Sequence, residues 1–129
     1  MTFTKAILAA ALPLAFATTA MADEIMVTPQ PAGNSVTVAS VTIANDGWLV
    51  IHEIRNGKPV VPASIGHVAI KAGTTENVTV SLTKDVVAGT KVLTMLHVDK
   101  GTGNVYEFPG ADHPVKQDGK PVVKPMAIN

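Results

Sequence analysis

Hydrophobic and polar residues alternate along most of this chain with the two-residue period of β-strands. Val78, Val80 and Leu82 fall on one side of such an alternation, which places them on the buried face of a strand. Residues 92–98 are nearly all apolar, as is typical of a central strand covered on both faces. Beyond residue 22, no window keeps the apolar spacing of a helix, so the pattern predicts strands throughout.

Short turn motifs separate these predicted strands. Asn45-Asp46-Gly47 precedes a strand over residues 48–54, and Asn56-Gly57 follows it. A glycine-bearing hairpin turn at residues 101–104 leads into a further strand predicted at residues 105–108. Roughly seven or eight short strands at intervals of about 8 to 12 residues predict an all-β chain folded as a β-sandwich.

The N-terminal 22 residues have a different pattern. Lys5 precedes an apolar run over residues 6–16, and Ala20-Met21-Ala22 matches the small-x-small rule for cleavage. We therefore expect a signal peptide over residues 1–22, cleaved before Asp23, and one β-sandwich domain over residues 23–129. The apolar run is shorter than the about 20 residues that span a bilayer, so we expect a soluble periplasmic or secreted product without membrane insertion.

Composition excludes several classes of function. The chain has no cysteine, which rules out disulfides, thiolate zinc sites, iron–sulfur clusters, thiol catalysis and the type 1 copper site. Ten basic residues balance ten acidic ones without a biased block, which argues against nucleic acid as a partner.

Several motifs occur in an order that is found in a known family. They are residues 46–52 (DGWLVIH), 65–66 (IG), 71–74 (KAGT), 95–99 (MLHVD) and 106–112 (YEFPGAD). Together they resemble an uncharacterised secreted domain of unknown function, found in cell-surface proteins of halophilic archaea and as single exported domains in bacteria. The resemblance covers most of residues 36–128. It implies an immunoglobulin-like antiparallel β-sandwich and no particular activity.

Histidines and carboxylates suggest one candidate metal site. His97 and Asp99 are two residues apart on a strand and so share a face, and the loop before His113 would fold back over that face. His52 lies on another strand. Imidazole and carboxylate together suit zinc, copper or another divalent ion, although no known ligand spacing is present. The alternative is that the strand histidines are structural and hydrogen-bonded.

The remaining polar and aromatic residues favour a non-catalytic role. None of the serines lies in a Gly-x-Ser-x-Gly elbow. Trp48, Tyr106 and Phe108 are expected to pack at one end of the sandwich, with a carbohydrate platform as the alternative. We expect a binding or structural module, not an enzyme, that needs no cofactor. Its partner would be an envelope protein, a cell-surface polymer or a second copy joined through an edge strand.

Overall fold

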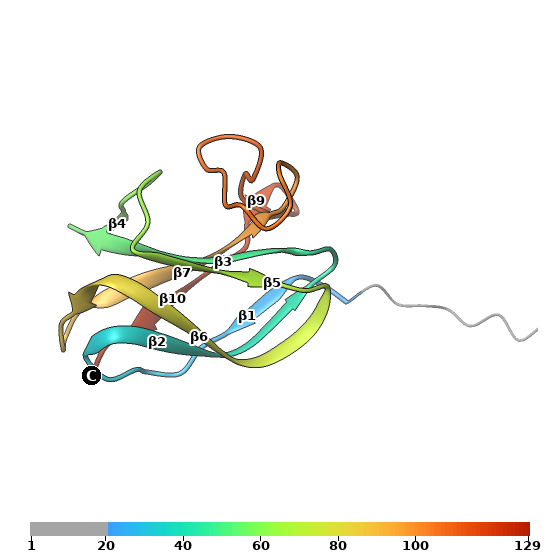
Figure 1. Cartoon of the computed structure of the whole chain (residues 1–129). Coiled ribbons are helices and arrows are strands. Elements are labelled where there is room, and N and C mark those ends of the chain that lie inside the picture. The colour runs from blue at the N-terminus through green and yellow to red at the C-terminus, as the bar shows by residue number, and fades with distance from the viewer. Residues whose placement is uncertain (1–20) are drawn as a thin grey trace, which may run out of the picture.

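Two antiparallel β-sheets packed face to face make up the fold in the computed structural model, which describes residues 21–129 (Figure 1). The first sheet has the order β1-β2-β6, with bounds Glu24–Met26, Gly33–Ile43 and Gly73–Val86. The second has the order β10-β7-β3, with bounds Val123–Ala127, Lys91–Val98 and Gly47–Arg55. The far side of β3 pairs with β4 (Lys58–Pro59) and β5 (Gly66–Ile70), and a separate hairpin joins β8 (Lys116–Gln117) to β9 (Lys120–Pro121).

This connectivity confirms the predicted immunoglobulin-like sandwich. In immunoglobulin domains the strands A, B and E lie in one sheet and C, F and G in the other. Here β1, β2 and β6 take the first set of places and β3, β7 and β10 the second, with β5 added beside β3. Seven of the described strands are three or more residues long, in line with the expected number. Most of the predicted signal peptide, residues 1–20, lies outside the described residues.

The core between the sheets is built by alternate residues of the long strands. Val36 and Val38 of β2 and Val78 and Val80 of β6 face the second sheet across the core. The facing residues on β3, β7 and β10 are Leu49, Ile51, Val92, Leu96 and Met126. Each such side chain contributes roughly 1.5 to 3 kcal/mol when fully removed from water, so this layer supplies most of the driving force for folding.

The outer face of the second sheet is buried as well. Residues of the opposite parity on β3 and β7, among them Val50, Leu93 and Met95, are almost fully shielded from solvent. The cover includes the segment of residues 99–115, named here the capping loop, which lies over β3 and β7 in Figure 1. Residues 60–63, between β4 and β5, contact the same face at His52. Its last residues also pair with β7, where the amides of Val98 and Val115 donate to His113 and Leu96 at 3.0 and 2.8 Å. Strand β7 is therefore covered on both faces, as its apolar run predicted.

The prediction of a strand at residues 105–108 is wrong, because this stretch forms turns inside the capping loop. The amide of Val105 donates to the carbonyl of Thr102, and the amide of Glu107 donates to the carboxylate of Asp112. With these donors used inside the loop, no neighbouring strand is paired at this point. Among residues 21–129 the structure has no helix long and apolar enough to cross a membrane.

Candidate functional site

Buried polar atoms without a partner are concentrated between the capping loop and the outer face of β3 and β7. Within the described residues, five buried side-chain polar atoms have no hydrogen-bond partner: Trp48 Nε1, His52 Nε2, His97 Nε2, Asp99 Oδ1 and Tyr106 Oη. All five belong to β3, β7 or the capping loop. Folded proteins pair nearly all of their buried polar groups, so such a concentration indicates a candidate functional site.

His52 is fully buried on the outer face of β3. Its Nδ1 lies 2.7 Å from the carbonyl oxygen of Ala63 and 3.2 Å from that of Val60, in the segment between β4 and β5. A carbonyl oxygen only accepts, so Nδ1 must be the protonated nitrogen. In the imidazole tautomer with Nδ1 protonated, Nε2 carries the lone pair, and no described residue donates to it.

His97 is equally buried, on β7, and is held in the same way. Its Nδ1 donates to the backbone carbonyl of Asp112 at 2.7 Å, so its Nε2 also carries the lone pair. Burial lowers the pKa of His97 from its usual value and outweighs the opposing effect of this hydrogen bond, while the nearby His52 lowers the pKa further. His97 is therefore neutral at pH 7. The two imidazole centroids are 6.0 Å apart with an angle of 31° between the ring planes.

Aromatic rings surround this pair. Phe108 meets His97 edge-on with centroids 4.6 Å apart, and Tyr106 lies 5.6 Å from the same ring. Trp48 completes the enclosure 5.7 Å from Tyr106, and His67 of β5 packs 4.5 Å from Tyr106 at the exposed edge. Burial, together with the Asp112 carboxylate, raises the pKa of Tyr106 to about 12, so its hydroxyl is a neutral donor. The predicted aromatic packing is thus part of the site.

Asp112 holds the capping loop in place. One oxygen, Oδ1, accepts the amides of Lys100 and Gly101 at 2.9 and 3.2 Å, and Oδ2 accepts the amide of Glu107 at 2.8 Å. Burial raises the pKa of Asp112, but these hydrogen bonds, with the one to Glu107 the strongest, bring the pKa below its usual value. The side chain is therefore an anion whose oxygens are committed to the backbone.

The four residues of the sequence-based metal hypothesis are not assembled into one cluster. The structure brings His52 and His97 together, whereas His113 is exposed with its ring 3.3 Å from its neighbour's carbonyl, and Asp99 lies where β7 ends. Across residues 21–129 no group of three or more histidine, cysteine, aspartate or glutamate side chains is arranged to hold a metal ion. The alternative interpretation was that the strand histidines are structural and hydrogen-bonded. Their Nδ1 atoms are indeed bonded to backbone carbonyls, whereas their Nε2 atoms have no hydrogen-bond partner.

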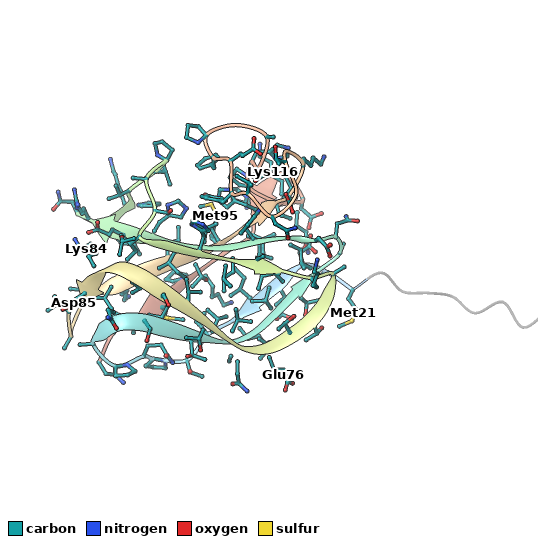
Figure 2. The ribbon with its side chains drawn as sticks, in the orientation of Figure 1. Met21, Glu76, Lys84, Asp85, Met95 and Lys116 are labelled. Carbon is teal, nitrogen blue, oxygen red and sulfur yellow. The ribbon has the colours of Figure 1, made fainter. Side chains whose placement is uncertain are left out.

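Sequence reasoning did not include Met95 in this site. Met95 is two residues before His97 on the same face of β7, and Figure 2 shows it on the side of the sheet turned toward the capping loop. The alternation of residues 93, 95 and 97 is a signal that could have found it. The sequence Asp112-His113-Pro114 does predict side-chain hydrogen bonds that shape this loop, and Asp112 makes them. Which amides it accepts was not readable from the sequence.

Comparison with known proteins identifies relatives of unknown activity. The sequence model of a domain of unknown function, DUF7282, matches residues 23–129. Over 90 residues the chain is 31% identical to cell surface glycoprotein 1 of Haloarcula hispanica, a match that covers 70% of this chain and 10% of the glycoprotein. The chain thus spans about a tenth of that relative's length. No solved structure matches the chain.

Proposed function

The chain belongs to the family of domains of unknown function DUF7282, and on that basis we propose that it is a non-enzymatic module exported to the bacterial periplasm or cell surface, where it binds or supports an envelope component. The observation that carries this proposal is the similarity to a surface glycoprotein. The match covers most of the sandwich domain of this chain but only a small part of the glycoprotein, as expected for a domain that recurs in different surface proteins.

The start of the folded domain supports export with cleavage before Asp23. Asp23 is the first residue of the family match, and its Oδ1 accepts the amide of Ala44 at 2.8 Å. Strand β1 begins at the next residue and pairs with β2. Cleavage after Ala22 therefore leaves every described strand intact and removes none of the core.

The use of the site's polar groups supports a non-enzymatic role. His52 and His97 have no exposed surface, and each commits its Nδ1 to a backbone carbonyl. The Asp112 carboxylate accepts three backbone amides. General acid–base catalysis needs such groups within hydrogen-bonding reach of a substrate, and both imidazoles are instead fully shielded from solvent.

Export is tested by expressing the full chain in a Gram-negative bacterium and measuring the intact mass of the protein released by osmotic shock. The expected product begins at Asp23. The matched control is Leu14→Arg, which breaks the apolar run of the predicted signal peptide and should leave an uncleaved chain in the cytoplasm. Recovery of both proteins uncleaved in the cytoplasm would contradict the proposal.

Association with the envelope is a separate measurement in cells that carry the protein naturally. After gentle rupture, a module bound to an envelope polymer or protein should sediment with the envelope and be released by high salt or detergent. Quantitative recovery in the supernatant at low salt would reject the binding role and leave only the location.

A further inference from the structure

The two buried histidines each have an Nε2 atom that takes no part in holding the fold together. Both are fixed by backbone carbonyls as Nδ1–H tautomers, and both present an Nε2 lone pair that no described residue donates to. A backbone carbonyl on the remote nitrogen is the arrangement that orients histidines bound to metals. Both side chains are fully buried, so they are preorganised on well-formed strands.

The separation of the two rings fits a shared ion. His52 lies opposite Leu93 across the β3–β7 pair, whereas His97 lies opposite Trp48, four residues further along β7. The rings nevertheless approach to 6.0 Å between centroids, so the side chains lean toward each other over the intervening pair of residues. A metal-bound nitrogen lies about 2.0 to 2.1 Å from the ion and the ring centre about 1 Å beyond it, which places two imidazoles on one ion about 6 Å apart.

The intervening pair contains a candidate for the third donor. The residues between the two histidines on this face are Val50 and Met95, which pair with each other across the strands. Met95 is only 7% exposed, and its flexible thioether is a soft ligand.

Charge and ligand type select the ion. Two imidazoles and a thioether bring no negative charge to the ion. The desolvation cost of a buried ion rises steeply with its charge, so this ligand set disfavours divalent ions. Thioether and imidazole are ligands of Cu(I). The Asp112 carboxylate is the nearby anion, and its oxygens are held by backbone amides so that it balances one positive charge from outside the ligand set.

We propose that His52 and His97, with Met95, form a buried binding site for one soft monovalent metal ion, Cu(I). The site keeps His52 and His97 from the divalent hypothesis, has Met95 in place of Asp99 and His113, and takes a monovalent ion. It does not depend on the cellular location proposed above. The rings of Trp48, Tyr106 and Phe108 exclude water from it, which protects Cu(I) from oxidation and disproportionation.

The first test is an anaerobic titration of the protein, produced from its full-length chain, with Cu(I) against a chromophoric Cu(I) chelator. One equivalent of Cu(I) should transfer to the protein, and Zn(II) should not compete. His52→Ala and His97→Ala should each weaken binding by 100-fold or more, and Met95→Leu, which preserves the packing, by about 10-fold. The matched control is His113→Ala, an exposed histidine outside the site, which should bind as the unaltered protein does.

A second measurement on the unaltered protein keeps the test valid if a histidine variant fails to fold. Ag(I) is a redox-inert stand-in for Cu(I), and one equivalent should shift the ¹⁵N resonances of two histidine Nε2 atoms while the other two histidines stay unchanged. No transfer of Cu(I) from the chelator overturns the proposal, as does binding that His113→Ala abolishes. Preference for Zn(II) over Cu(I) also overturns it.

Discussion

The Asp112 carboxylate is the most informative position for a stability experiment, because one side chain holds three amides of the capping loop. It accepts from Lys100 and Gly101 through Oδ1 and from Glu107 through Oδ2. Hydrogen bonds to a charged group contribute about 1.5 kcal/mol or more each, which gives about 4.5 kcal/mol for the three. Lys100 and Gly101 are exposed residues, so water recovers about half of their share. We expect Asp112→Ala to lower the free energy of unfolding by about 3 kcal/mol.

Asp112→Asn separates the roles of the two oxygens. The asparagine carbonyl still accepts the two amides now bound by Oδ1, but its NH₂ group faces the amide of Glu107, another donor. We expect a loss of about 1.5 kcal/mol, roughly one charge-assisted bond.

The assay is urea denaturation followed by far-UV circular dichroism, with hydrogen exchange of the three amides as the local readout. Asp85 is an exposed aspartate on β6, and Asp85→Ala should change stability by less than about 0.5 kcal/mol. The reasoning is refuted if Asp112→Ala costs less than about 1 kcal/mol, or if Asp112→Asn and Asp112→Ala are equally destabilised.

Two further predictions concern close packing and pH. Gly47→Ala should destabilise the fold by about 1 to 3 kcal/mol, because its added methyl group would overlap the backbone carbonyl of His97 on the paired strand; Gly103→Ala, with open space around it, should be neutral in the same urea assay. The pKa of His97 is lower in the folded protein than in the unfolded chain, so below about pH 6.5 the unfolded chain binds a proton at His97 that the folded protein does not. The free energy of unfolding should therefore fall as the pH drops below this value. It should fall more steeply below about 4, where the unfolded chain also protonates Asp112, whose folded pKa is lowered as well. Trp48 is the sole tryptophan, so its emission should report the loosening of the capping loop; a free energy of unfolding that is flat from pH 7 to 4 would contradict both assignments.

Turn chemistry was readable directly from the sequence. The string Gly-Lys-Pro-Val-Val occurs at residues 57–61 and again at 119–123. In both copies the glycine and the residue before it adopt positive φ, with values of 51° and 73° for Asn56 and Gly57 and 52° and 76° for Asp118 and Gly119. These are the conformations of a tight two-residue hairpin turn, which asparagine, aspartate and glycine adopt at low cost.

The sequence by itself determined most of the strands, the turns and the sandwich, because period-two alternation and turn residues act over a few neighbouring positions. It also placed His97 on a strand and Tyr106 near Phe108, but the strand ends at Val98, so Asp99 does not share it as predicted. It could not show that residues 105–108 would not form a strand, since that outcome depends on a carboxylate at Asp112 that captures the local amides.

Only the tertiary structure decided which polar groups meet. The alternation of β3 and β7 assigns each residue to a face, but it does not say that both faces will be covered. The capping loop covers the outer face through contacts between distant segments, and it supplies the Asp112 carbonyl that fixes the tautomer of His97. The approach of His52 to His97 likewise depends on side-chain direction across two paired strands, which no local pattern encodes. The candidate site is therefore a product of long-range packing on a fold that local patterns had already specified.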